Sequence, residues 1–358
     1  MNYKKTLLIA LGILTLLIVG VWSYMYYSSP QAAKLTSPEG QAARAEVLNR
    51  FNANDLDGAI ASAQKLVKND NSENSLLGLL QLANAYVQKA GFSSSSSEAK
   101  EYANKAIDSA RQVLLIDLEN QEAYRVTGYA YEILQDYPNA EKNYTKALQI
   151  DPKFDLALSN RGHLYELMGD RDKAFADYNA AYAINTKGDF TQLNLARYYF
   201  ETDEPGQATV LAKGAISSSN NARLKSMAHE VLGNIYFSAG STTEALAEFN
   251  TAISIDAAYA DPYFDRSFLT MSLADEKGMD ASTTKTVLGD IEQGLAINPA
   301  KAFGYFLTGM VYYSGDKAKA KAGFEKALGM VDADVTVVGQ NKTLLKQDIQ
   351  EQLSDLSK

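Results

Sequence analysis

The chain has 358 residues, of which 46% are hydrophobic and 22% are charged, so its composition is that of a folded protein. It contains no Cys, which excludes disulfides, thiolate nucleophiles and Cys-ligated metals, and its only two His lie far apart in sequence. The formal net charge is -9, so nucleic-acid phosphates should repel the protein. We therefore predict no nucleic-acid partner, no metal and no cofactor.

The amino-terminal segment has the pattern of a membrane span. No charged residue occurs from Thr6 to Ala33, and residues 6–27 are long enough as a helix to cross a bilayer core of about 30 Å. Lys4 and Lys5 precede this segment, and aromatic residues gather at its other end. By the positive-inside rule, this pattern predicts a cytoplasmic amino terminus and a body on the far side of the membrane.

These features divide the first part of the chain into a cytoplasmic tip (1–5), a transmembrane signal anchor (6–27) and a flexible stalk (28–37). A cleaved secretory signal is the alternative for the same apolar run. Both interpretations export the body, and both predict an extracytoplasmic location for it.

The body of the chain repeats itself with a period of 34 residues. Small residues recur at Gly128, Gly162 and Ala196, and the same shift relates three further sets of positions. These sets are Tyr131, Tyr165 and Tyr199; Ala140, Ala174 and Ala208; and Ala147, Ala181 and Ala215. A further copy follows after a short insertion, with Gly233, Tyr236, Ala245 and Ala252.

Each repeat predicts a pair of amphipathic helices. In one copy the first helix is expected from Asp155 to Met168, with Gly169 as its carboxyl cap, and the second from Asp170 to Ala183. Close approach of two helix axes requires small residues, so we expect the glycine of the first helix to face an alanine of the second. The recurrent Tyr would then fill the space between neighbouring pairs.

These residues resemble the tetratricopeptide repeat family. One copy matches its pattern with Tyr124, Gly128, Tyr131, Ala140, Tyr144, Ala147 and Pro152. The resemblance implies an all-α fold, a right-handed superhelical solenoid of tetratricopeptide helix hairpins, here with one N-terminal transmembrane helix. The array would occupy residues 38–334 in about seven to eight pairs, and an amphipathic C-terminal capping helix would occupy 335–358.

No catalytic motif is present, so we expect a protein that is not an enzyme. In the family, first helices line a concave groove, and counting from the aligned small residues gives the positions that would face it. The candidate partner-binding residues are Arg125, Asn160, His163, Asn194, Arg197, Asn234, Phe264, Phe268, Phe303 and Phe306. Asn160 and Asn194 occupy the same position in successive repeats, as in family members that grip extended polypeptides. Some of the Phe residues would alternatively pack beneath the tail helix.

The pattern as a whole predicts a membrane-tethered protein–protein interaction scaffold, an assembly or adaptor factor of the cell envelope, whose partner is a protein or peptide segment. Two alternatives remain from the sequence. The chain could be a structural protein that associates with its own copies as a homo-oligomer, or a non-catalytic subunit of an envelope enzyme complex.

Overall fold

The structure is a computed structural model of the chain. It describes residues 42, 45–47, 49–50, 53, 55–68, 72–93, 95–274, 279–332, 334 and 339–357. Within these ranges, no helix combines the length and apolar character that a bilayer crossing needs. The predicted tip, anchor and stalk at residues 1–37 lie outside the described residues, so they stay predictions.

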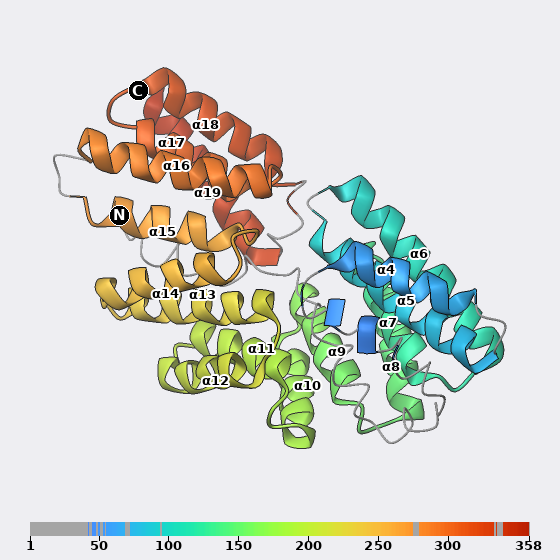
Figure 1. Cartoon of the computed structure of the whole chain (residues 1–358). Helices are drawn as coiled ribbons and strands as arrows, with labels where there is room; N and C mark the ends of the chain where they lie inside the picture. The colour runs from blue at the N-terminus through green and yellow to red at the C-terminus, as the bar shows by residue number, and fades with distance from the viewer. Residues whose placement is uncertain are drawn as a thin grey trace. The chain divides into compact units, whose positions relative to one another are not determined.

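The described ranges are helical and contain no strand, as Figure 1 shows. The prediction of an all-α fold is therefore confirmed. The helices are α4 (Leu56–Val67), α5 (Ser72–Phe92), α6 (Ser96–Ile116), α7 (Gln121–Ile133), α8 (Tyr137–Ile150), α9 (Asp155–Leu167), α10 (Arg171–Ile184), α11 (Asp189–Glu201), α12 (Pro205–Ser218), α13 (Ala222–Ser238), α14 (Thr242–Ile255), α15 (Asp261–Ser272), α16 (Ala281–Ile297), α17 (Ala302–Tyr312), α18 (Lys317–Met330) and α19 (Gly339–Leu356).

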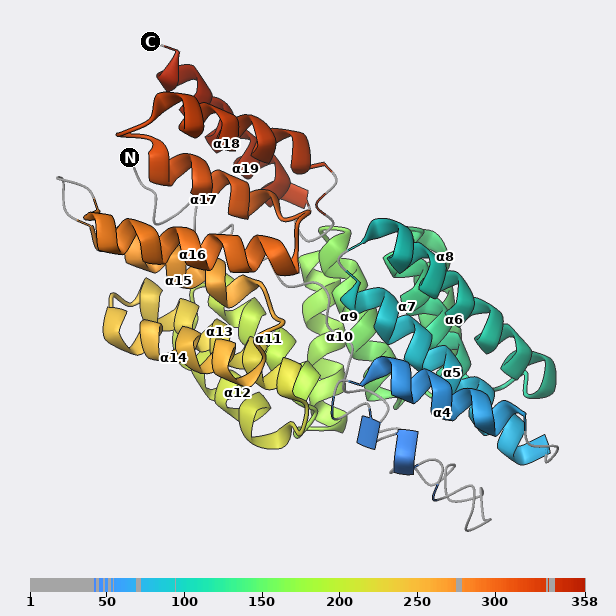
Figure 2. The ribbon, with the colours of Figure 1, turned by 45° about the horizontal axis from the view of Figure 1, so that its top comes forward.

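The chain divides into two compact units. Of the described residues, those up to Leu195, with Ser217–Leu224, form the amino-terminal unit. Ala196–Ile216 and Lys225–Lys358 form the carboxyl-terminal unit. In the first unit α5, α7 and α9 pack on one another and each also packs on the helix that follows it in sequence, so helix pairs stack side by side (Figure 2). In the second unit α15 and α17 pack in the same way, with α16 and α18 as their partners.

Caps define where many of these helices begin. Asp136, Asp170 and Asp316 precede α8, α10 and α18, and each side chain accepts a hydrogen bond from a backbone N–H of the first turn. At the end of α9, Gly169 has φ +80, the left-handed conformation that a glycine cap adopts. The bounds of α9 and α10 lie within one residue of the predicted ones.

The small residues of the first helices face aromatic rings of the second helices. A Cβ atom added to Gly128 would lie 2.7 Å from the ring of Tyr144, and one added to Gly162 would lie 2.8 Å from the ring of Tyr178. Both rings are fully buried. We expected these glycines to face alanines. At both positions the nearest atoms belong instead to the tyrosine ring, and at Gly162 the backbone oxygen of Ala174 follows at 3.1 Å. The tight contact is between glycine and a ring, while Ala140 and Ala174 are buried nearby on the same second helices.

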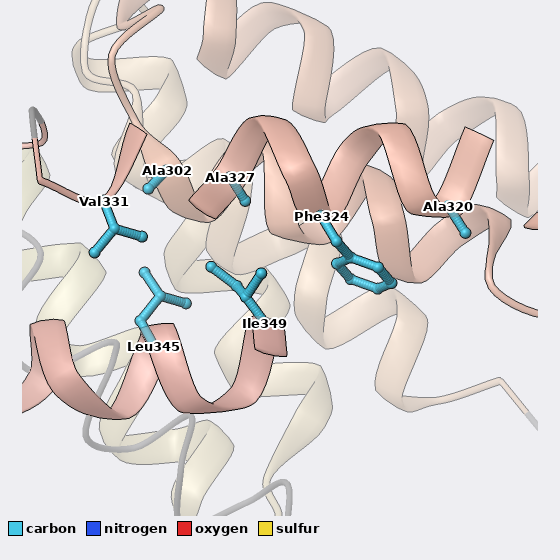
Figure 3. Packing of buried hydrophobic residues seen from close by; sticks show 7 residues of the cluster. All are labelled: Ala302, Ala320, Phe324, Ala327, Val331, Leu345 and Ile349. Carbon is cyan, nitrogen blue, oxygen red and sulfur yellow. The ribbon is translucent and has the colours of Figure 1, made fainter. Parts of the chain in front are cut away.

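The last helix covers the end of the carboxyl-terminal unit. Leu345 and Ile349 of α19 lie in one apolar cluster with Phe324, Ala327 and Val331 at α18 (Figure 3). Ile349 is fully buried in this cluster. Leu345, Leu353 and Leu356 belong to the same cluster. The apolar side of α18 is thus closed off by α19.

Candidate functional site

The first helices of the amino-terminal unit carry an unusual layer of buried polar side chains, which we call the polar layer. Its members come from α5, α7, α9 and α11, and each is at most 8% exposed. They are Gln81, Asn84, Gln88, Glu122, Arg125, Glu132, Ser159, Asn160, His163, Thr191 and Asn194. The second helices instead bury Ala and Tyr, so the two faces of this unit differ in chemistry.

Arg125 is fully buried in the polar layer and is held by two neighbours. Its Nε and Nη2 donate to the two carboxylate oxygens of Glu122, both at 2.7 Å, and Nη2 also donates to Asn84 Oδ1 at 2.8 Å. The bidentate geometry is the strongest form of such a pair. Because Asn84 lies on α5, the pair also joins two adjacent first helices. Arg125, which was predicted to line the groove, thus bonds to residues of its own unit.

A second polar connection joins α7 to α9. Glu132 Oε1 lies 2.8 Å from His163 Nδ1, and Glu132 Oε2 accepts a hydrogen bond from Tyr144 at 3.0 Å. Burial is the first cause that raises the pKa of Tyr144 well above its usual value, followed by repulsion from the Glu132 charge. This phenol therefore remains a donor at any physiological pH, and it anchors the carboxylate that meets His163.

Several amides of the polar layer have no bonding partner. Among the described residues, neither the amide nitrogen nor the amide oxygen of Gln81, Gln88 or Asn160 finds one, and Asn194 Nδ2 also lacks an acceptor. All four side chains are nearly fully buried. Buried polar groups in proteins are almost always hydrogen-bonded, so each exception calls for an explanation. Amides offer both donors and acceptors, which together match a polypeptide main chain.

The predicted aromatic residues of the carboxyl-terminal unit divide into two kinds. Phe264 is 0% and Phe303 is 1% exposed, and both lie in one core cluster. Phe268 and Phe306 are only partly buried against that cluster. Phe264 and Phe303 thus hold helices together. The ring of Phe268 lies 5.9 Å from that of Phe237, and Phe306 also packs against the cluster that contains Leu345 and Ile349 of the tail helix.

The remaining two predicted residues belong to the carboxyl-terminal unit and meet one carboxylate. Arg197 Nη2 lies 3.8 Å from Glu230 Oε2, and Asn234 Nδ2 donates to Glu230 Oε1 at 2.8 Å. Burial raises the pKa of Glu230 to about 7, although the Arg197 charge opposes that rise. No group of three or more His, Asp or Glu in the described ranges is arranged to hold a metal ion.

The sequence interpretation missed Gln81, and the signal for it was present. Asn160 and Asn194 stand two residues before the small residue of their repeats, Gly162 and Ala196. The same count from Ala83 reaches Gln81. In the carboxyl-terminal repeats the same count reaches Asp265 from Ser267, but the apolar Val231 from Gly233. Gln88 does not fall on any of the positions predicted to face the groove. It belongs to the polar layer because α5, with 21 residues, is longer than α7, α9 and α11 and extends the layer by one turn.

Comparison with known proteins bears on the class of this fold. The family model described as TPR repeat matches residues 128–169 and 233–269, and the model described as Tetratricopeptide repeat matches 157–187. No curated protein matches the chain. The chain therefore carries tetratricopeptide repeats in these segments, which confirms the predicted repeat type.

Solved structures agree on the fold. The crystal structure of the APC/C hetero-tetramer Cut9–Hcn1 is similar over 93% of this chain, with a TM-score of 0.67 and 14% sequence identity. The human IFIT1 dimer with m7Gppp-AAAA is similar over 90% of this chain and 82% of its own, with a TM-score of 0.59 and 12% identity. The present chain spans 58% of the length of its match in the Cut9–Hcn1 structure. At these identities the similarity concerns the fold alone.

Proposed function

We propose that this protein is an interaction scaffold that binds an extended segment of a partner protein along the first helices of its amino-terminal unit. Tetratricopeptide arrays commonly serve as binding surfaces of this kind. The observation that carries the proposal is the set of partnerless buried amides at Gln81, Gln88 and Asn160. A bound main chain would supply the donors and acceptors that the unit itself does not provide.

The energetic reason is the cost of an unmade hydrogen bond. A buried polar group without a partner costs about 1–3 kcal/mol, whereas an apolar side chain of similar size at the same place costs nothing of this kind. An interior built only for stability would therefore have Leu at position 160. Amides at several such positions favour a function in binding over one in folding.

The test uses the purified full chain in mild detergent and a random-peptide phage library. We expect the protein to select peptides whose binding survives replacement of single side chains but is lost on N-methylation of the backbone. Asn160→Leu should weaken binding by about tenfold or more for each lost pair of bonds, without loss of folding stability. Gln112→Leu, at an exposed position of α6, is the matched control. Equal binding by both variants, or tolerance of N-methylation, would contradict the proposal.

The proposed scaffold is tethered to a membrane by residues 6–27 and works outside the cytoplasm, as an assembly or adaptor factor of the cell envelope. The uncharged segment and the lysines before it support this part of the proposal. Protease added to intact cells or spheroplasts should degrade the repeats, and alkaline carbonate should leave the full chain in the membrane pellet. Recovery of the uncleaved chain in the soluble fraction would refute the tether.

A further inference from the structure

The carboxyl-terminal unit buries a cluster of charges that the proposed main-chain binding does not use. Three carboxylates belong to it, Glu230 on α13 and Asp261 and Asp265 on α15, and they are 2%, 4% and 2% exposed. Two cations accompany them, Arg197 on α11 and Lys301 just before α17. Burial of a charge is costly unless an opposite charge or hydrogen bonds compensate it. A buried carboxylate without a cation beside it therefore indicates a site where a cation could bind.

Two of the carboxylates have a cation beside them. Lys301 Nζ lies 2.8 Å from Asp261 Oδ1, and Arg197 Nη2 lies 3.8 Å from Glu230 Oε2. Glu230 also accepts a hydrogen bond from Tyr259 at 3.2 Å. Within the described part of the chain, Asp265 forms no ion pair, and the charges of Glu230 and Asp261 repel its own. The cluster therefore contains one carboxylate more than its cations match.

Asn234 bridges two of the acids and leaves acceptors unused. Its Nδ2 donates to Glu230 Oε1 at 2.8 Å and to Asp265 Oδ2 at 3.4 Å. Among the described residues, no donor reaches Asn234 Oδ1 or Asp265 Oδ1, and both side chains are at most 3% exposed. Two buried acceptors, one of them on an uncompensated carboxylate, thus lie on adjacent first helices of this unit.

We propose that Asp265 and Asn234 form a binding site, the cation pocket, for one lysine or arginine side chain of a partner protein. This inference rests on the proposed scaffold function and adds the chemistry of the partner. A cation with several N–H donors would satisfy both vacant acceptors and supply the missing positive charge. Lysine and arginine carry their charge at the end of a long apolar stem, which suits an acceptor set below the surface. A metal ion fits less well, since no metal-binding group of acids or His occurs in the described ranges.

The charges around Asp265 determine how such a pocket would respond to pH. Burial, then repulsion from Glu230 and Asp261, raises the pKa of Asp265 well above its usual value, whereas the Asn234 hydrogen bond and the Lys301 charge lower it. Asp334, which accepts from the Ala302 N–H, adds to the repulsion at Asp261. Because the pKa of Asp265 is raised, a proton competes with an entering cation for this carboxyl group. Binding should release a proton and strengthen as pH rises.

The experiment compares peptides that the full chain selects from the random library with those selected by Asp265→Asn and by Glu244→Gln, an exposed control at the start of α14. The native protein and the control should select a Lys or Arg at one fixed position, and Asp265→Asn should lose that preference. Replacing the basic residue by Ala should weaken binding to the native protein by about tenfold or more, and binding to Asp265→Asn by less than about twofold. Calorimetry in buffers of different ionisation enthalpy should detect proton release with the native protein only.

The outcomes separate this inference from the scaffold proposal. Peptides that bind through their main chain but carry no preferred basic residue would overturn the cation pocket alone. A basic preference that persists in Asp265→Asn would also overturn it. Failure to select any peptide would count against both proposals. Thermal unfolding checks that Asp265→Asn is folded, which is expected because the substitution replaces a carboxyl group by an amide of the same shape.

Discussion

Replacing Gly162 by Ala tests the glycine–ring contact that packs each helix pair. The added methyl carbon would lie 2.8 Å from Cδ1 and Cε1 of Tyr178 and 3.1 Å from the carbonyl oxygen of Ala174. Unstrained carbon contacts are about 3.5–4.0 Å, so the ring or the helix must move by roughly 1 Å. The ring is held at its far end, because its hydroxyl donates to Glu166 at 2.7 Å.

Two opposing effects decide whether Gly162→Ala raises or lowers the free energy of unfolding. Alanine is a better helix former than glycine by about 1 kcal/mol, and overpacking in a tight core costs about 1–3 kcal/mol. Because the contact is rigid on both sides, we expect the second effect to win, for a net loss of up to about 2 kcal/mol. Gly289 is the matched control. It lies inside α16, and a Cβ there would meet nothing within 4 Å, so Gly289→Ala should stabilise the protein by up to about 1 kcal/mol.

Urea unfolding of the full chain in mild detergent, followed by circular dichroism, measures both variants. A double-mutant cycle sharpens the test, because the penalty of Gly162→Ala should disappear when Tyr178 is replaced by Ala. If Gly162→Ala stabilised the protein as much as Gly289→Ala does, the contact would not constrain the repeat, and our account of why small residues recur every 34 positions would be refuted.

Three other changes have defined outcomes by the same unfolding assay. Arg125→Met leaves Glu122 buried without its cation and should cost about 3–5 kcal/mol, whereas a loss below about 1 kcal/mol would contradict the role assigned to this buried pair. Burial raises the pKa of Glu230 from 4.5 to about 7, so the folded state binds the proton more tightly, and the free energy of unfolding should fall by roughly 3 kcal/mol as pH rises through this window. Glu230→Gln should flatten that part of the profile, and an unchanged slope would contradict the assignment. Ile349→Ala should cost about 2–4 kcal/mol because Ile349 is fully buried against α18, and a change near zero would mean that α19 does not cover the unit.

The sequence predicted the helix pairs well because the repeat pattern is dictated by local rules. Period, cap residues and apolar spacing are all short-range signals, and they located Asp170 and Gly169 correctly. The partner of each glycine was not predicted correctly. Alignment shows which positions recur, but only packing shows that the ring of Tyr178, and not an alanine methyl, fills the space beside Gly162.

The candidate residues were harder to interpret because inward-facing position and availability are different properties. Arg125 and His163 stand at positions predicted to face inward, and each is buried and bonded to a carboxylate of the same unit. Which polar residues find partners depends on side chains far away in sequence, such as Asn84 for Arg125 at 41 positions and Glu132 for His163 at 31, and no local pattern reports this. Asn160 is distinguished only by the bonds that it does not make.

The two units solve the same packing problem with different polar chemistry on their first helices. In the amino-terminal unit the unsatisfied groups are neutral amides, which bind donors and acceptors alike but cannot attract charge. In the carboxyl-terminal unit the unsatisfied acceptors accompany an excess carboxylate, which favours a cation. The amino-terminal unit would therefore recognise a main chain, and the carboxyl-terminal unit would recognise a basic side chain. Amide contacts tolerate many sequences and a buried carboxylate does not, so selectivity among partners should depend mainly on Asp265.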